Sequence, residues 1–174
     1  MARRTDVFDL DRMGLRSGEG RRLELHVALA PLAYGGQRYD AGPDPVPAVL
    51  DVSRTVSSGW ALRLRFEAEL SGPCVRCLEP ATPRYAVDGR EVHQPGGGDE
   101  LASPYVDADG ELDLERWARD ALALALPAQI TCRPDCLGLC PQCGAELNDD
   151  PGHAHEKAPD HRWAKLAELR LDGD

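Results

Sequence analysis

The sequence contains no apolar stretch of the roughly 18 residues that a membrane-spanning helix requires. It begins with two adjacent arginines, Arg3 and Arg4, but no apolar run follows them, so the opening lacks the composition of an export signal. We therefore expect a cytoplasmic protein that does not interact with a membrane.

The sequence also lacks the motifs of the common enzyme classes. It contains no phosphate-binding loop, no dinucleotide-binding fingerprint and no convincing nucleophile motif. It has no internal repeats of useful length. These absences favour a protein that is not an enzyme and that has no catalytic residues and no small-molecule substrate.

Basic residues are few for a protein that would bind nucleic acid over a broad surface. Twenty lysines and arginines stand against thirty aspartates and glutamates, which gives a formal charge of −10. Residues 99–120 hold eight carboxylates and two arginines, and residues 146–174 hold eight carboxylates and four basic groups. Such an acidic surface repels phosphate backbones and attracts basic partners. The alternative is that the carboxylates only keep the protein soluble.

Alternating apolar residues predict an antiparallel sheet in the first half of the chain. The period of two is clear at residues 23–29 and strictest at residues 62–70. Weaker strands are expected at residues 48–56, after the turn residues 42–45, and at residues 84–92, after Pro83. We expect these strands to form a partly closed sheet.

The second half of the chain has a different pattern. Residues 93–103 include three consecutive glycines and predict a loop. Asp113 can cap a helix that ends before Pro127, with apolar residues at helical spacing: Leu114, Trp117, Ala121 and Leu124. A short closing helix is predicted at residues 161–171. The prediction is therefore an α+β fold, with a β-rich region at residues 1–98 and an acidic helix plus metal-binding segment at residues 99–174, packed as one unit.

Six cysteines give the strongest chemical signal. One pair, Cys74 and Cys77, follows the best predicted strand, and the other four lie within twelve residues: Cys132, Cys136, Cys140 and Cys143. The run Cys140-Pro141-Gln142-Cys143-Gly144 is typical of a zinc knuckle. In a reducing compartment, close Cys-x-x-Cys pairs favour metal binding over disulfides.

His153 and His155 raise the number of candidate ligands to eight, which is enough for two tetrahedral zinc sites. The favoured partition joins Cys74, Cys77, Cys132 and Cys136 in one site and leaves Cys140, Cys143, His153 and His155 for the second. A single site built from the four late cysteines is the competing arrangement. Alternatively, the histidines are surface residues and some cysteines are buried apolar side chains. We expect one or two structural Zn²⁺ ions, although iron in a four-cysteine site fits the same pattern.

Two catalytic alternatives use the same residues. Cys74 and Cys77 have the spacing of a thiol oxidoreductase, but Pro80 and the strand-rich surroundings disfavour the helix that such sites place after the first cysteine. A zinc-dependent hydrolase would need an open coordination position, a nearby acid or base and a pocket. The sequence gives no indication of that pocket.

Several short motifs, taken in order, resemble one known family. They are residues 74–80 (CVRCLEP), 111–114 (ELDL), 124–127 (LALP), 136–148 (CLGLCPQCGAELN) and 162–169 (RWAKLAEL), preceded by 7–10 (VFDL) and 14–18 (GLRSG). This order is similar to that of the bacterial YceD family, known as large ribosomal RNA subunit accumulation proteins. The resemblance spans nearly the whole chain.

The resemblance implies a non-enzymatic role in the accumulation of large-subunit (23S) ribosomal RNA. Genes of this family often lie beside that of a small zinc-ribbon ribosomal protein of the large subunit. Members without the knuckle tend to keep groups matching Cys74, Cys77, Cys132 and Cys136, which supports the two-site partition. Many members carry Cys-x-Cys where this chain has His153-Ala154-His155.

The partner implied is a ribosomal protein of the large subunit, the large-subunit ribosomal RNA, or both. A basic ribosomal protein fits the acidic composition best, because opposite charges accelerate association. Direct recognition of RNA would use Arg63, Arg65, Arg76 and neighbouring loops, although the first two also fit the solvated face of a strand.

Overall fold

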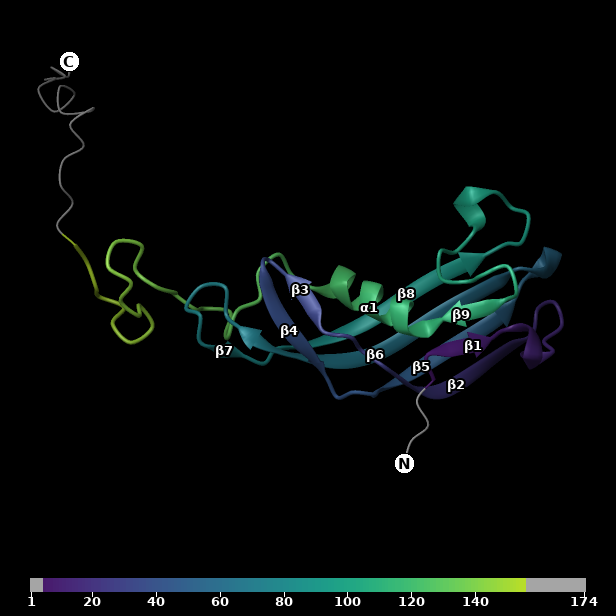
Figure 1. The fold of residues 1–174 in the computed structure, drawn as a ribbon, viewed down its shortest axis with the longest axis horizontal. Coiled ribbons are helices and arrows are strands. Elements are labelled where there is room, and N and C mark those ends of the chain that lie inside the picture. Colours follow the sequence, from purple (N-terminus) through teal and green to yellow (C-terminus); the bar gives the residue numbers. More distant parts are fainter. Residues whose placement is uncertain (1–4, 156–174) are drawn as a thin grey trace, which may run out of the picture.

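A seven-stranded antiparallel sheet forms most of the molecule, as the computed structural model of residues 5–155 shows (Figure 1). Its strands are β2 (Gly20–Val27), β3 (Leu32–Tyr34), β4 (Gln37–Gly42), β5 (Val46–Arg54), β6 (Trp60–Pro73), β7 (Pro80–Ala81) and β8 (Arg84–His93). The four predicted strands correspond to β2, β5, β6 and β8, which confirms them. With one α-helix added, the α+β class is also confirmed.

The long strand β6 organises the sheet. Along one side it pairs with β5 and then, at its end, with β4; along the other side it pairs with β8 and then β7. Strand β2 pairs with β5 and forms one outer edge. Each side of β6 pairs with two strands, one after the other along its length. The sheet is therefore extended along β6 and is not closed into a barrel. The outer strands β2 and β8 do not pair with each other, so the sheet is open and the predicted partial closure is wrong.

A second, two-stranded sheet joins the two halves of the sequence. It pairs β1 (Val7–Asp9) with β9 (Glu111–Asp113). Short 3₁₀ turns lie at η1 (Asp11–Met13), η2 (Val56–Ser58) and η3 (Asp99–Leu101), the last within the predicted loop. The division of the chain at residue 98 stays a prediction, and contacts such as β1 with β9 cross it.

Helix α1 (Leu114–Ala125) covers the inner face of the sheet beside β8 (Figure 1). The predicted cap is confirmed, because Asp113 accepts a hydrogen bond from the backbone N–H of Arg116 at 2.9 Å. Trp117 is buried against the sheet, as expected. Leu124 is 87% exposed, which corrects its assignment to the apolar face; Leu122 takes that place because it lies nearer the centre of the buried stripe.

The main core lies between the sheet and α1. Alternate side chains of β6 form its wall, from Trp60 through Leu64 to Leu70, while the residues between them face outward. Beyond β7, residues 131–155 form a narrow end of the molecule, where a separate small cluster of residues is buried: Cys74, Cys77, Ala81 and Cys136. The predicted closing helix at residues 161–171 lies outside the described residues. No helix among residues 5–155 is long and apolar enough to cross a membrane.

Candidate metal centres

Two turns of the same backbone geometry present the two Cys-x-x-Cys pairs. In the first turn, the N–H of Leu78 donates to the carbonyl of Cys74 at 3.0 Å. The N–H of Cys74 donates to the carbonyl of Glu79 at 2.8 Å. In the second, the N–H of Gly144 donates to the carbonyl of Cys140, and the N–H of Cys140 to that of Ala145, both at 2.8 Å. Each pair is therefore held in a knuckle that directs both sulfurs to one side.

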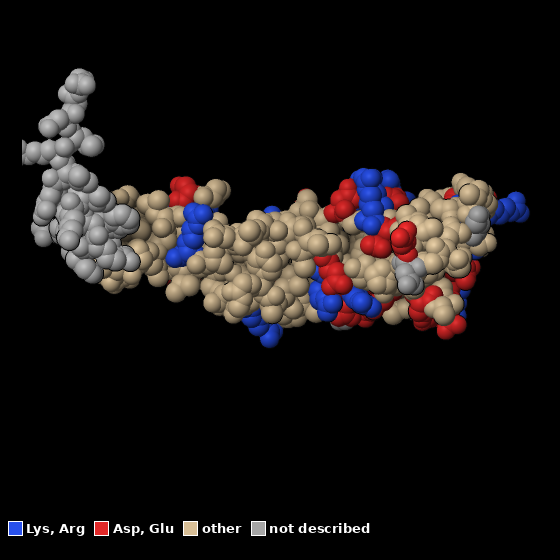
Figure 2. All heavy atoms as spheres, turned by 90° about the horizontal axis from the view of Figure 1, so that it is seen from above, with Lys and Arg blue, Asp and Glu red and all other residues tan. Residues whose placement is uncertain are grey.

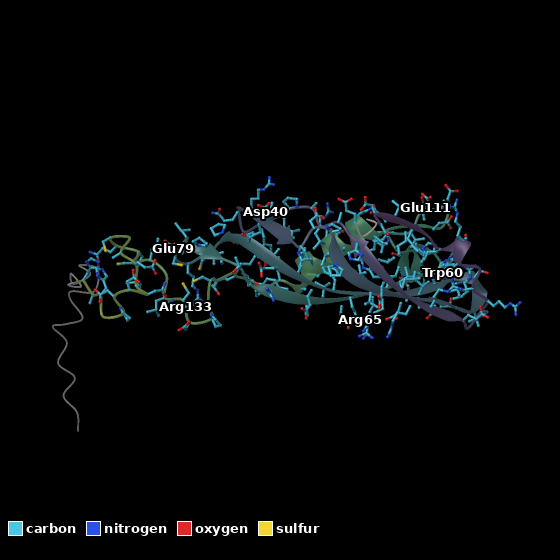
Figure 3. All side chains as sticks on the ribbon, turned by 90° about the horizontal axis from the view of Figure 1, so that it is seen from below. Asp40, Trp60, Arg65, Glu79, Glu111 and Arg133 are labelled. Carbon is cyan, nitrogen blue, oxygen red and sulfur yellow. The ribbon has the colours of Figure 1, made fainter. Side chains whose placement is uncertain are left out.

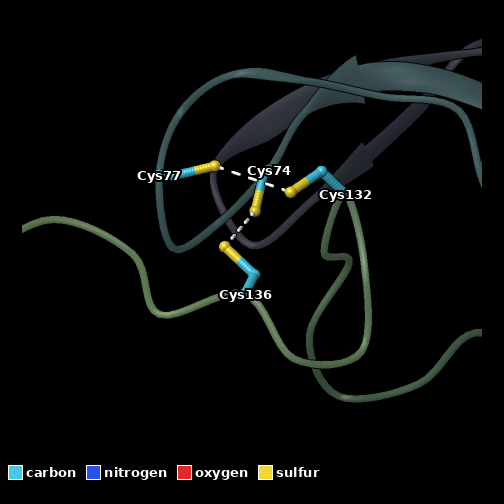
Figure 4. Close-up of side chains that lie close together, drawn as sticks. All are labelled: Cys74, Cys77, Cys132 and Cys136. Atoms are coloured by element: carbon cyan, nitrogen blue, oxygen red, sulfur yellow. Dashed lines mark hydrogen bonds between the residues drawn. The ribbon is translucent and has the colours of Figure 1, made fainter. Parts of the chain in front are cut away.

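The first cluster consists of four cysteine sulfurs: Cys74, Cys77, Cys132 and Cys136 (Figure 4). All lie within 4.8 Å of one another, and the Cys74–Cys136 and Cys77–Cys132 pairs are 3.8 and 3.7 Å apart. A tetrahedron with Zn–S bonds of about 2.3 Å has edges of about 3.8 Å. All six cysteines are free, and the separations in this cluster far exceed the roughly 2 Å of a disulfide. The cluster has the dimensions of a four-thiolate metal site.

The second cluster combines two sulfurs with two imidazole nitrogens: Cys140, Cys143, His153 and His155. The Nε2 atom of His155 lies 3.3 Å from the Cys140 sulfur and 3.2 Å from that of Cys143, and the two Nε2 atoms are 2.9 Å apart. These separations are a few tenths of an ångström below the edges expected for a tetrahedral zinc site with this donor set. Cys132 and Cys136 thus lie with the early pair and not with Cys140 and Cys143.

The segment after α1 is docked on the first knuckle by hydrogen bonds from the knuckle itself. The N–H of Val75 donates to the carbonyl of Ile130 at 2.9 Å. The guanidinium of Arg76 donates to the carbonyl of Cys136 at 2.9 Å and to the side chain of Gln129 at 3.2 and 3.3 Å. Cys132 and Cys136 are therefore brought to Cys74 and Cys77 by contacts that the sequence motif itself supplies.

The first cysteine of each knuckle has a lowered pKa. Burial opposes ionisation of Cys74. Hydrogen bonds to its sulfur from the backbone N–H groups of Cys77, Cys132 and Arg76 outweigh this effect and lower its pKa to about 6. Backbone N–H groups in the second knuckle lower the pKa of Cys140 to about 6 as well. In contrast, burial raises the pKa of Cys77 to about 12. Each knuckle thus offers one ready thiolate, and a bound cation would favour the charged form of Cys77.

The same geometry bears on the two catalytic alternatives. Cys74 follows strand β6 and Cys77 precedes β7, so the helix that a thiol oxidoreductase places after its first cysteine is replaced by a strand. Each cluster supplies four protein donors, whereas a catalytic zinc keeps one position open. Four donors in each cluster could close the coordination sphere of a metal ion.

One residue of the first knuckle, Leu78, has an unusual backbone conformation. Leu78 occupies the position of Gly144 in the sister knuckle and has φ of +65°, with 59% of its surface exposed. A left-handed conformation costs a residue with a Cβ about 1–2 kcal/mol, partly offset by the extra freedom that glycine has when unfolded. We expect Leu78→Gly to raise the stability of the metal-loaded protein by about 0.5–1 kcal/mol, measured by denaturant unfolding.

Leu137→Gly is the matched control, because this leucine is similarly exposed, borders the same clusters and has an ordinary φ. It is expected to lower stability. Equal effects of the two substitutions would show that the knuckle does not strain Leu78.

The three arginines considered for RNA recognition all have partners within the chain. Arg63 forms a two-bond ion pair with Asp88 at 2.7 and 2.6 Å, and Arg65 bonds Asp51 at 2.6 Å, both on the outward face of the sheet. The bond from Arg63 lowers the pKa of Asp88. Arg76 is occupied by the docked segment described above. In this structure the three arginines therefore form hydrogen bonds within the protein itself.

Charged groups are unevenly distributed over the surface. On the face seen in Figure 2, acidic and basic side chains gather over the sheet and are sparse toward the end that carries the clusters. Figure 3 places Glu79 and Arg133 at this cluster end, and Trp60 and Glu111 at the opposite end. The acidic loop around β9 thus lies far from the metal-binding residues.

Sequence reasoning missed the residues that surround the ligands. Gln129 orients Arg76, and Asn148 bonds the Cys136 sulfur from the second knuckle. The only signal for Asn148 was its place in the family motif at residues 136–148, because its contact joins segments that spacing alone does not relate.

Comparisons with known proteins agree with the motif order. The family model described as "Large ribosomal RNA subunit accumulation protein YceD" matches residues 62–170. An uncharacterized protein of Mycobacterium tuberculosis is 37% identical, over 94% of this chain and 80% of the relative. One of Mycobacterium leprae is 31% identical, over 94% and 76%.

A Zea mays protein is named "Large ribosomal RNA subunit accumulation protein YCED homolog 1, chloroplastic". It is 44% identical, over 80% of this chain and 59% of the relative. No solved structure matches the chain.

Proposed function

Because the chain belongs to the YceD family of large ribosomal RNA subunit accumulation proteins, we propose that it promotes accumulation of 23S ribosomal RNA by binding a basic large-subunit ribosomal protein in the cytoplasm. The family match carries this proposal. In it the protein is a binding factor and not an enzyme, which agrees with two clusters that each supply four donors and leave no coordination position for a substrate.

The metal ions of this proposal are two Zn²⁺ ions with a structural role. One is held by Cys74, Cys77, Cys132 and Cys136, and the other by Cys140, Cys143, His153 and His155. Thiolate and imidazole donors in a tetrahedral arrangement favour zinc over the harder cations, which prefer oxygen ligands. The zinc ions fix the narrow end of the molecule to the sheet, because that end has only a small buried cluster of its own.

Exposed carboxylates that form no ion pair within the described structure support a basic protein as the partner. The chain carries ten more carboxylates than basic groups, and exposed acidic residues such as Asp109 and Glu111 have no side-chain ion pair within the described structure. The arginines that would contact RNA are instead engaged by Asp51, Asp88 and the carbonyl of Cys136. Long-range attraction therefore favours a positively charged partner.

The proposal predicts which molecules copurify with the protein. We expect a tagged chain to retain large-subunit ribosomal protein after nuclease digestion, and to lose it as salt is raised from about 50 to 200 mM, since screening weakens attraction between exposed charges. Retention is measured by mass spectrometry of the eluate.

Charge-matched variants sharpen this test. Asp109→Lys with Glu111→Lys reverses two exposed charges beside β9, whereas Glu24→Lys with Glu67→Lys makes the same change in net charge on the outward face of the sheet. Loss of the ribosomal protein only in the first pair would locate the contact near β9. Recovery of RNA alone, with no ribosomal protein after nuclease treatment, would contradict the proposal and favour direct RNA binding.

A further inference from the structure

Three residues connect the two metal clusters and are held from both sides. Residues 137–139 run from Cys136, the last donor of the first cluster, to Cys140, the first donor of the second. The N–H of Leu139 donates to the carbonyl of Arg76 in the first knuckle at 3.2 Å. On the other side, the carbonyl of Gly138 accepts the N–H of Leu147 at 2.9 Å. The two knuckles therefore share one short, fixed connection.

The connection leaves no space for a side chain at its centre. Gly138 has φ of +77°, and a Cβ at this position would lie 2.9 Å from the carbonyl oxygen of Arg76. Glycine is the residue that combines this conformation with such a close approach of two backbones. A displacement of either knuckle is thus transmitted to the other.

Asn148 adds a direct bond between the clusters. It belongs to the loop between Cys143 and His153, yet its Nδ2 atom donates to the sulfur of Cys136 at 3.5 Å. Its Oδ1 atom accepts the N–H of Leu137 at 2.8 Å. A donor of this kind stabilises a thiolate ligand, so a residue positioned by the second cluster supports a ligand of the first.

We propose that the two metal sites fill cooperatively and that Asn148 couples them. A metal ion at the second site fixes the loop from Cys143 to His153 and thereby places Asn148 against Cys136. By thermodynamic linkage, an ion at the first site favours the second by the same factor. This inference rests on the metal occupancy proposed above.

The substitution Asn148→Asp removes the coupling bond, together with the bond that the same Nδ2 atom donates to the carboxylate of Glu146. The shape of the side chain is retained, and one oxygen still accepts from Leu137, but the donor facing Cys136 becomes a second acceptor. Gln142→Glu is the matched control, because it makes the same amide-to-carboxylate change on an exposed side chain of the second knuckle. We expect about a tenfold loss of zinc affinity at the first site in Asn148→Asp, as removal of a supporting bond typically gives, and little change in the control.

A double-mutant cycle tests the coupling itself. His153→Ala with His155→Ala disables the second site, and zinc affinity of the first site is then measured by competition with a chelator. We expect about a tenfold loss in the otherwise unchanged protein and no further loss when the histidine substitutions are made in Asn148→Asp. Native mass spectrometry should find less singly loaded protein than independent sites would give in zinc titrations of the unchanged chain, and more of it in Asn148→Asp.

The outcomes distinguish this proposal from the one on which it rests. Two zinc ions that bind independently, with a statistical share of singly loaded protein, would overturn the coupling and leave both sites standing. A first-site affinity unaffected by the histidine substitutions would do the same. Absence of any bound zinc in the purified, reduced protein would overturn both.

Discussion

Removal of the metal ions is expected to unfold residues 132–155 while the sheet and α1 stay folded. Among residues 5–155, the buried cluster at this end consists of Cys74, Cys77, Ala81 and Cys136, so it has little apolar surface of its own. A structural zinc ion contributes an apparent binding free energy of about 10–16 kcal/mol near neutral pH, and this becomes folding free energy where no core replaces it.

Helix α1 belongs to a different cooperative unit. Its residues Leu114, Trp117 and Leu122 pack in the main core with the inner face of β6. Hydrogen exchange measured by mass spectrometry, with and without a strong chelator, should therefore show loss of protection at residues 132–155 and unchanged protection at residues 114–125.

Restoring zinc to the chelated protein serves as the control and should return protection to residues 132–155. Cys136→Ser removes a ligand of the first site alone, so it should lower protection at residues 132–136 without any chelator present. If protection at residues 114–125 fell in parallel, the metal ions would support the whole fold. Unchanged exchange throughout would contradict a structural role for metal.

The second large effect is expected at Gly72 in strand β6. A Cβ at this position would overlap the ring of Tyr39, whose Cδ1 atom would be only 2.3 Å away. Tyr39 cannot move aside, because it is fully buried and its hydroxyl donates to the carbonyl of Pro73 at 2.9 Å. We expect Gly72→Ala to lower the free energy of unfolding by about 3 kcal/mol, in the range of overpacking substitutions.

Gly42→Ala provides the matched comparison in the same sheet. Gly42 pairs with Glu69 of β6, and a Cβ there meets nothing within 4 Å. The midpoint of denaturant unfolding should fall clearly for Gly72→Ala and little for Gly42→Ala. Equal midpoints would show that the ring of Tyr39 gives way, and the packing argument would be wrong.

Much of the fold follows from local patterns in the sequence. The strict alternation at residues 62–70 predicted β6 because one face of that strand is buried along its whole length, and Asp113 predicted the start of α1 through its capping bond. Strands β1, β3, β7 and β9 were missed because two or three residues are too few for an alternation to be seen, and β4 (Gln37–Gly42) was missed because its six residues do not alternate between apolar and polar. Whether the sheet closes depends on pairing between β2 and β8, which no local pattern encodes.

The candidate site could be predicted only in part, for a related reason. Each Cys-x-x-Cys spacing forms a local turn, so both knuckles were evident. The favoured partition also grouped Cys132 with Cys77, 55 residues away, but spacing gave no sign of the contacts from Val75 and Arg76 that bring them together. The bond from Asn148 to Cys136 depends in turn on those contacts. Occupancy by zinc stays a prediction.

Along the described chain, the two longest edge strands of the open sheet are β2 and β8, and the short strands β3 and β7 also lie at an edge. Such edges invite a second copy to add its own strand and begin aggregation. Here each edge carries charged side chains: Arg21, Arg22 and Glu24 on β2, and Arg84, Asp88, Arg90 and Glu91 on β8. Edge-to-edge addition would bring these groups against one another and strip them of water, so the charges protect an acidic protein from polymerising through its own sheet.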